Sequence, residues 1–301
     1  MKKASKIKLV FLVALFVICH CNNLFGRQVV QVVTKTINKE IDIKAGDTLK
    51  VFAEKAQVHI TGWKGSSVIL KLELISKHPK REVAEEELAY LDYQIENDNE
   101  LLIRNYFSIA NGFRKVKGNL SARYELKVPE ALAIQVQNKY GTLNLKSLKG
   151  FLKVNTRFVN NTIENCDGEQ IVEAIFGKTD LLNSGGISNL NLQKADLNVN
   201  YYSGKVKIIS NYGFASFMGD HFQSIEMESS RTTIGFTLSD LSLYNYKLIS
   251  SNSKVIVPGI FQERKDESSY EHTHGTEKPW IKITNTFKPI TLNLQYNASN
   301  K

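Results

Sequence analysis

The residues with the clearest capacity for chemistry lie in the segment EHTHG near the carboxyl end. His272 and His274 are separated by one residue, and Glu271 and Asp266 lie close to them. This spacing places both imidazoles on one side of an extended strand, where they could contact a metal ion. Histidines in a polar segment are more often solvated, so the sequence favours neither a metal site nor a cofactor.

Stacked carboxylates are the second kind of residue that could do chemistry, because polysaccharide cleavage takes acids on one shared surface. A period of 18 residues, described below, allows columns of equivalent positions to be compared. Neither acidic column repeats its carboxylate: Asp180 aligns with Asn144, Thr162, Asn198 and Ser216, and Glu173 with Gln137, Asn155, Asn191 and Ile209. No nucleophile elbow, zinc-protease, phosphate-loop or paired C-x-x-C motif is present. We therefore predict no catalytic residues and a protein that is not an enzyme.

The elements that would position any site are revealed by this period. The segment NKYGTLNL, beginning at Asn138, resembles AIFGKTDL, beginning at Ala174. Four columns with a step of 18 keep their character: Val136, Val154, Val172, Leu190, Ile208; Tyr140, Phe158, Phe176, Lys194, Tyr212; Leu145, Ile163, Leu181, Val199, Phe217; and Gly150, Gly168, Gly186, Gly204. Several columns at one period indicate a repeat array.

Within each unit, apolar and polar residues alternate with a period of two, which is typical of half-buried strands. We therefore expect an all-β fold, a β-solenoid of 18-residue coils in which stacking completes the core. Glycines are expected at turns that need positive φ or close backbone approach: Gly65, Gly141, Gly150, Gly168, Gly177, Gly186, Gly204 and Gly213.

The aromatic column allows two interpretations. Tyr140, Phe158, Phe176 and Tyr212 could form a strip that binds sugars, or they could be part of the core. Because alternation assigns them to the face of Val136, we expect a core stack that also contains Val154, Val172, Leu145, Ile163 and Leu181. Cys166 aligns with Leu148 and Ser184, which favours a small buried residue over a reactive thiol.

The regular 18-residue array is expected over 130–222, and its pattern extends beyond these residues. Leu49, Val51, Val58 and Ile60 repeat the offsets of the array, so the region 27–129 is expected to contribute a similar coil. That region also contains a short helical insertion near 82–92. Residues 223–301 are expected to form longer coils with an exposed polar loop over 262–278, and the last strand pair, 280–285 and 290–295, closes the end of the stack. Residues 27–301 together could be one continuous domain.

The amino terminus has the pattern of a secretory signal over 1–26. Lys2, Lys3, Lys6 and Lys8 precede an apolar run of about ten residues, half of the roughly 20 that span a bilayer. Cleavage at Gly26 is favoured over lipidation at Cys19 or Cys21, since the residues before these cysteines are not small. We expect an exported protein of the periplasm or cell surface, with no transmembrane segment in the mature chain.

The net charge of +9 falls to about +5 without the four lysines of this leader. A mild surplus spread over so long a chain does not indicate a nucleic-acid partner. Only Cys166 remains as a thiol, so no internal disulfide is expected.

Several segments resemble one family. L-x-V-x(6)-V-x-I-x-G-W begins at Leu49, Y-x-L-x-V-P begins at Tyr124, and the aromatic-glycine turns recur through the array. Over roughly 34–248, the chain resembles the exported bacterial adhesin-like β-repeat family of unknown function. The resemblance implies stacked short strands and brings no catalytic residue with it.

Three functions fit the sequence, in descending order. The first is a non-enzymatic envelope scaffold that contacts polysaccharide or envelope proteins. The second is a periplasmic sensor of envelope stress whose open end pairs with a partner strand. The third, a distant alternative, is a polysaccharide lyase or hydrolase.

Overall fold

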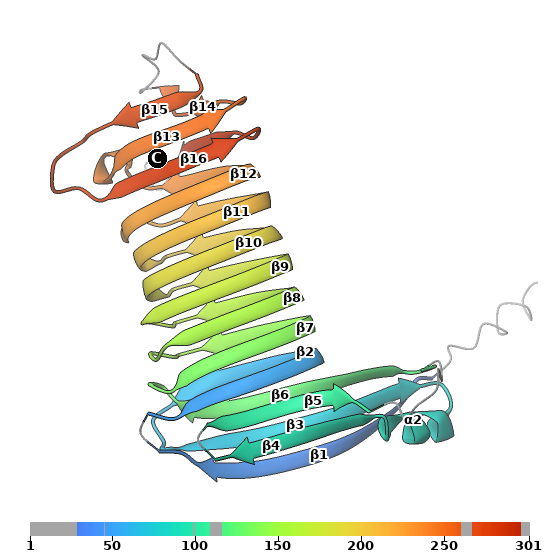
Figure 1. The fold of residues 1–301 in the computed structure, drawn as a ribbon. Helices are drawn as coiled ribbons and strands as arrows, with labels where there is room; N and C mark the ends of the chain where they lie inside the picture. The colour runs from blue at the N-terminus through green and yellow to red at the C-terminus, as the bar shows by residue number, and fades with distance from the viewer. Residues whose placement is uncertain (1–28, 45, 99, 109–115, 260–266, 296–301) are drawn as a thin grey trace, which may run out of the picture.

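The structure is a computed structural model that describes residues 29–44, 46–98, 100–108, 116–259 and 267–295. The fold is all-β, and its long strands follow one another up a stack that rises from an N-terminal group of strands (Figure 1). The expected leader, with Gly26, Cys19 and Cys21, lies outside the described residues.

Parallel strands form the body of the stack. In spatial order they are β2 (Thr48–Trp63), β7 (Ala133–Lys146), β8 (Leu152–Glu164), β9 (Glu169–Leu182), β10 (Gly185–Asn200), β11 (Ser203–Met218) and β12 (Phe222–Leu238). From β7 to β11, each residue lies opposite the one 18 positions further on, as Val136 lies opposite Val154. The register shifts between β11 and β12 after Gly204. Equivalent positions of the sequence therefore become columns that run along the stack.

The interior of the stack is apolar. Val136, Val154, Val172, Leu145, Ile163 and Leu181 are each at most 1% exposed. Full burial of such a side chain stabilises a fold by roughly 1.5–3 kcal/mol. One cluster of polar residues within the core is linked by side-chain hydrogen bonds: Asn161 Nδ2 donates to Thr156 Oγ1 at 3.0 Å and to Thr179 Oγ1 at 3.2 Å.

Each strand of the stack bends at a residue whose backbone is left-handed, and in β7 this residue is Tyr140, with φ +63°. The next residue, Gly141, also has positive φ, and a Cβ there would collide with the carbonyl oxygen of Ala56 on β2. Glycine is needed at this position because the backbones of neighbouring strands approach so closely.

The N-terminal end of the stack is covered by two strands. β5 (Leu101–Phe107) pairs with the first part of β2, and β6 (Asn119–Pro129) pairs with the second part. The remaining strands are antiparallel: β6 pairs with β3 (Ser67–His78), β3 with β1 (Gln31–Asp42), and β5 with β4 (Leu91–Asn97). The apolar positions of Leu49 and Val51 are expected to repeat those of the array, and in the structure Leu49 lies opposite Ile134.

The helix of the described residues, α2 (Arg81–Leu88), ends earlier than expected for 82–92. Leu91 and Asp92 belong to β4, where Leu91 is buried and lies opposite Phe107. Tertiary pairing with β5 outweighs the weak helical pattern there. None of the helices in the described residues has the length and apolar character that a bilayer crossing takes.

The C-terminal end departs from expectation. β16 (Trp280–Thr286) and β17 (Ile290–Leu294) pair with β12 on one side, and with β13 (Asn245–Ser251) and β14 (Val255–Ile256) on the other. The last strand pair therefore lies inside the stack and does not close it. A short 3-10 helix, η1 (Leu241–Leu243), precedes β13.

The expected polar loop 262–278 is also partly wrong. Residues 262–266 lie outside the described residues, but β15 (Ser269–His272) is a strand that pairs antiparallel with β13. The backbone bonds with β13 account for this strand despite its polar sequence.

Candidate functional site

The predicted aromatic core column lies on the outside of the stack. Tyr140, Phe158 and Tyr212 are 50%, 40% and 41% exposed, and Phe176 is half-buried. The expectation that they pack in the core is wrong, because the left-handed backbone at each of these positions interrupts the alternation that had assigned them inward.

These aromatics belong to a longer column, which we call the corner ladder. Every member has a left-handed backbone, with φ from +49° at Lys55 to +67° at Phe287. The strand registers place the members one above another in this order: Lys55, Tyr140, Phe158, Phe176, Lys194, Tyr212, Arg231 and Phe287.

The rings of the corner ladder contact one another and the cations by their faces. The centroids of Tyr140 and Phe158 are 5.1 Å apart, and those of Phe158 and Phe176 4.6 Å apart, with the planes within 2° of parallel. Lys194 Nζ lies 5.4 Å from the Phe176 centroid. Arg231 Cζ lies 5.1 Å from the Tyr212 centroid and 5.0 Å from that of Phe287. Ring faces are thus largely covered within the ladder, and ring edges and cationic groups are left to solvent.

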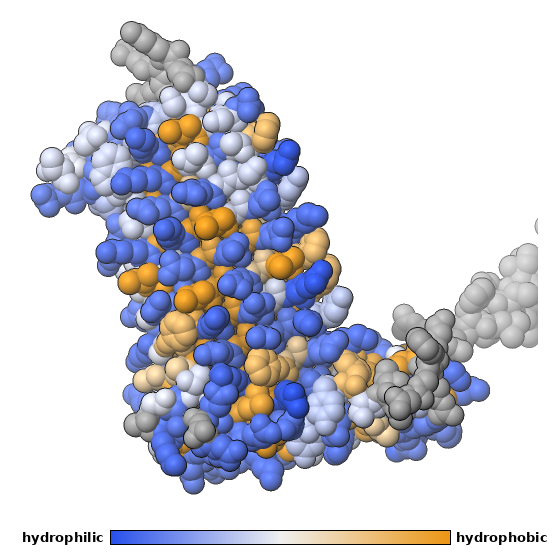
Figure 2. Space-filling model, in the orientation of Figure 1, coloured by the Kyte–Doolittle hydropathy of each residue, from blue (hydrophilic) through white to orange (hydrophobic). Residues whose placement is uncertain are grey.

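One signal in the sequence pointed to this exposure. Lys194 occupies the same column as Tyr140 and Phe176. An unpaired lysine is almost never fully buried, so its presence favours an outward column. Figure 2 shows the wider context, in which hydrophobic side chains are interspersed among hydrophilic ones along the visible face of the stack.

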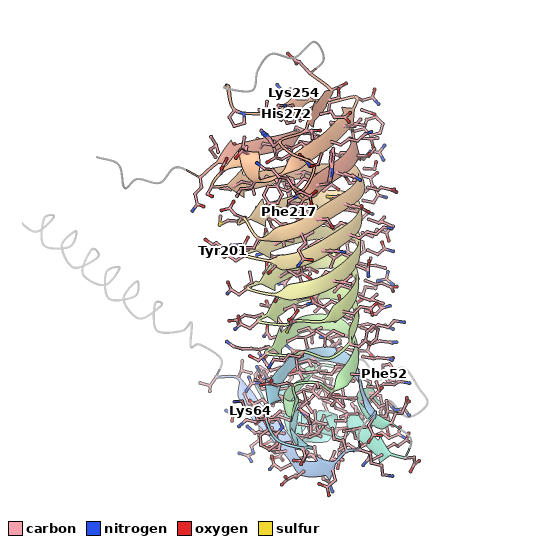
Figure 3. The ribbon with its side chains drawn as sticks, turned by 90° about the vertical axis from the view of Figure 1, so that its left-hand side faces the viewer. Phe52, Lys64, Tyr201, Phe217, Lys254 and His272 are labelled. Atoms are coloured by element: carbon pink, nitrogen blue, oxygen red, sulfur yellow. The ribbon has the colours of Figure 1, made fainter. Side chains whose placement is uncertain are left out.

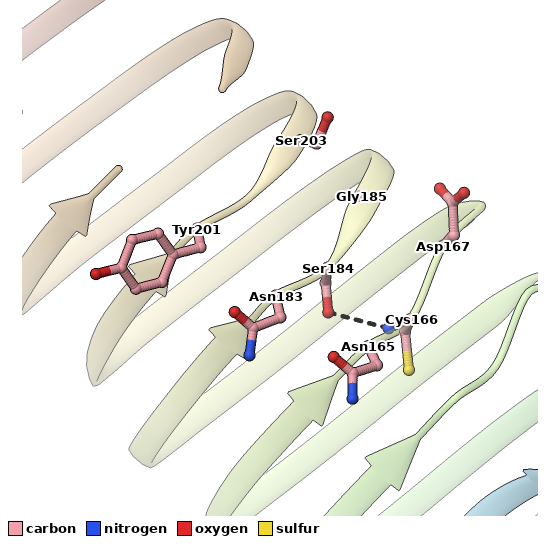
Figure 4. Close-up of a pocket in the computed structure, with 8 residues that line it drawn as sticks. All are labelled: Asn165, Cys166, Asp167, Asn183, Ser184, Gly185, Tyr201 and Ser203. Atoms are coloured by element: carbon pink, nitrogen blue, oxygen red, sulfur yellow. Dashed lines mark hydrogen bonds between the residues drawn. The ribbon is translucent and has the colours of Figure 1, made fainter. Parts of the chain in front are cut away.

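A second feature is a hollow where successive strands are joined. Its volume is about 410 Å³, and it is open to solvent. We call it the Tyr201 hollow, since Tyr201 projects from the edge of the stack (Figure 3) and forms part of its wall (Figure 4). Its lining comes from three successive turns: Asn165, Cys166, Asp167, Asn183, Ser184, Gly185, Tyr201 and Ser203.

Two glycines let successive turns lie close together at the Tyr201 hollow. A Cβ at Gly185 would lie 2.7 Å from the carbonyl oxygen of Ser203 and 3.3 Å from Asp167 Oδ1. At Gly219, on the next turn, a Cβ would lie 3.2 Å from Tyr201 Cδ1. Larger residues at these two positions would therefore push the turns of the hollow apart.

The polar groups of the hollow suit hydroxyl-bearing ligands. The ring of Tyr201, which is 51% exposed, provides an apolar surface. Asn165 and Asn183 provide amides, Ser203 a hydroxyl and Asp167 a carboxylate (Figure 4). An aromatic surface with a few convergent polar groups is the usual composition of a small-ligand site.

Cys166 lies in the lining of this hollow, yet its side chain is buried. Its backbone N–H donates to Ser184 Oγ at 3.1 Å. Burial raises the pKa of the thiol to about 11, which leaves it protonated at neutral pH. The structure thus places Cys166 as a small buried residue.

The predicted turn glycines occupy two kinds of position. Gly141, Gly168, Gly177, Gly186, Gly204 and Gly213 have positive φ, whereas Gly65 and Gly150 do not. At Gly150, a Cβ would collide with the carbonyl oxygen of Leu132, so close approach accounts for that glycine. At Gly65, a Cβ would collide with the Trp63 ring.

The histidine pair lies at the far end of the stack. The ring centroids of His272 and His274 are 4.2 Å apart, and burial lowers the pKa of His274. The backbone N–H of His274 donates to Asn245 Oδ1 at 2.7 Å. Asp266 is outside the described residues, and within those residues no group of three or more His, Cys, Asp or Glu side chains could hold a metal ion.

Comparison with known proteins gives structural likenesses only. No family model matches the chain, and no curated protein matches its sequence. A "putative adhesin" from Parabacteroides merdae is 12% identical with a TM-score of 0.40, covering 88% of this chain and 97% of its own. A "putative adhesin" from Bacteroides fragilis is 13% identical with a TM-score of 0.35, covering 85% and 97%. A "putative lipid binding protein" from Parabacteroides distasonis is 12% identical with a TM-score of 0.30, covering 88% and 97%.

Proteins named as adhesins are thus among the structures that this chain resembles, as the sequence predicted. Because these structures have TM-scores of 0.40 or lower, the function has to be argued from the residues of this chain.

Proposed function

We propose that the protein is an exported, non-enzymatic β-solenoid scaffold of the cell envelope or surface that binds glycan in the Tyr201 hollow. The leader-like sequence over 1–26 supports export. The parallel, in-register pairing of β7 to β11 supports a solenoid whose interior is completed by stacking.

The observation that carries the binding role is the composition of the hollow. An exposed tyrosine and residues that carry amide, hydroxyl and carboxylate groups together line about 410 Å³ of open space. Aromatic rings contact the apolar faces of sugars, and the polar groups can exchange hydrogen bonds with sugar hydroxyls.

The same lining favours binding over cleavage. Glycoside hydrolysis generally uses two carboxyl groups on either side of the scissile bond. Among the residues that line the hollow, Asp167 is the one carboxylate, and its Oδ1 accepts the backbone N–H of Gly168 at 2.9 Å. The residues that line the hollow therefore do not include the acid pair of a glycoside hydrolase.

The experiment is a neutral-glycan array with the exported chain, followed by titration of each glycan that binds. We expect Tyr201→Ala to weaken binding at least tenfold and Ser203→Ala to weaken it severalfold, since the first removes the ring and the second removes a hydroxyl group of the lining. Phe214→Ala, which removes an exposed ring outside the hollow, is the matched control. Binding that both hollow variants leave unchanged, or no binding to any glycan, would contradict the proposal.

A sensor whose open end accepts a partner strand finds less support. At the C-terminal end of the stack, β15 already pairs with Tyr246–Ile249 of β13. A partner strand at that position would have to displace it.

A further inference from the structure

The corner ladder is a second surface, separate from the Tyr201 hollow. Seven of its members lie at the bend within a strand and Phe287 lies between β16 and β17, whereas the hollow lies where successive strands of the stack are joined. The eight members follow one another along the stack without a break. With about 4.8 Å between strands, seven intervals give the ladder a length of roughly 34 Å.

The way the rings are arranged decides what they can bind. Flat stacking on a sugar needs a free ring face, but Phe158 has Tyr140 on one face and Phe176 on the other. The outer face of Phe176 is covered by the ammonium group of Lys194. At Phe158 and Phe176 solvent therefore meets ring edges, and the edge of an aromatic ring carries the positive part of its quadrupole.

Cationic side chains add to this positive edge. Lys55, Lys194 and Arg231 are members of the ladder, and Lys139 and Arg157 directly precede Tyr140 and Phe158. None of these five cations takes part in a salt bridge within the described part of the chain. Their charges are consequently not neutralised by neighbouring carboxylates.

Two acidic residues lie near the ladder, but they do not make its net charge negative. Glu54 precedes Lys55, and Asp196 lies two residues after Lys194. Asp196 Oδ1 accepts the backbone N–H of Phe214 at 2.9 Å, so this carboxylate is held by the backbone. With five cationic residues and two acidic residues, the net charge along the corner ladder is positive.

We infer that the corner ladder binds a linear polyanion, a polysaccharide bearing carboxylate or phosphate groups, laid along the stack. A straight line of cations fixed to a rigid scaffold suits a ligand with regularly repeated anions. Each contact is weak on a solvent-exposed surface, but many contacts to one chain act together.

The test uses polygalacturonate as the polyanion and dextran as a neutral polymer of similar length. We expect the exported chain to bind polygalacturonate and not dextran at low salt, with binding weakened as salt is added. Lys194→Gln combined with Arg231→Gln should weaken binding about tenfold, since each exposed charge pair contributes up to about 1 kcal/mol.

The matched control is Lys205→Gln combined with Lys207→Gln, which removes the same charge from exposed positions of β11 outside the ladder. An equal loss in both double variants would mean attraction to net charge alone and would overturn the inference. No polygalacturonate binding, equal binding to dextran, or preference for anionic lipid vesicles over the polymer would overturn it as well.

Two further variants test the corner ladder separately from the Tyr201 hollow. Phe158→Leu keeps an apolar side chain but removes a ring edge, and should weaken polygalacturonate binding without a large change in the thermal midpoint. Tyr201→Ala should leave polygalacturonate binding unchanged, so that failure of the hollow and failure of the ladder are distinguishable.

Discussion

At the scale of single residues, the close approach of successive backbones makes Gly186 a sensitive position. It has φ +86°, and a Cβ there would collide with the carbonyl oxygen of Gly168. We expect Gly186→Ala to lower the free energy of unfolding by at least about 2 kcal/mol, from left-handed strain together with the collision. Gly235→Ala is the control, since a Cβ at Gly235 meets no atom within 4 Å. Urea unfolding measures both, and equal stability of the two variants would contradict the close approach.

The thiol of Cys166 gives a second prediction at this scale. Burial raises its pKa to about 11 from a model-compound value of 9.0. The unfolded chain therefore loses this proton at lower pH than the folded chain, and the thiol's contribution to stability falls as pH rises from about 9 to 11. At pH 8 we expect a disulfide reagent to react with the folded protein far more slowly than with the unfolded protein. Equally fast reaction in both states would show that the thiol is accessible.

The residues of β7 show what alternation predicts and where it stops. Val136 and Leu145 are buried as the period of two indicates, because the strand is extended around each of them. Tyr140 lies between them at a left-handed position, where the alternation is interrupted and its own side chain is exposed. Near Tyr140, Gly141 is the one residue whose type indicates a left-handed backbone. Lys194, which occupies the same column as Tyr140, indicates that the side chains of this column face solvent.

At the scale of elements, the position of β16 and β17 leads to a prediction about truncation. Ile281, Ile283, Ile290 and Leu292 of these strands are buried between β12 on one side and β13 and β14 on the other. Each contributes roughly 1.5–3 kcal/mol, so together they approach the net stability of an ordinary domain. A chain that ends at Lys278 should lose its cooperative thermal transition.

The control for this truncation is a chain that ends at Gln295, which keeps both strands and should unfold like the intact protein. An unchanged transition in the shorter chain would mean that β16 and β17 only cover an end. The alternation of 280–285 and 290–295 sufficed to predict two strands there. Their insertion between β12 and β13 could not be predicted, since it reverses the order of the chain and depends on long-range pairing.

At the scale of the whole molecule, the stack has different neighbours at its two ends and in its middle. β9 and β10 are paired along both edges with parallel strands. At one end β2 is covered by β5 and β6, and at the other β13 is covered by β15. The 18-residue period anticipated the middle because each strand from β7 to β11 pairs in register with the strand 18 residues further on. The ends follow no period, and their strands are set by contacts between segments far apart in the chain.

This arrangement predicts a gradient of local stability along the stack, which hydrogen exchange can measure. The amides of β9 and β10 can open only when two neighbouring ladders are disrupted, whereas β15 and β4 each have one pairing strand in the described residues. We expect exchange to be slowest in β9 and β10 and fastest in β15 and β4. Gly186→Ala should accelerate exchange in β9, β10 and β11 first, because β10 pairs with β9 on one edge and with β11 on the other. Two results would mean that the molecule opens as one unit. The first is equal protection from exchange in β15 and β9, and the second is an acceleration by Gly186→Ala that is the same in all strands.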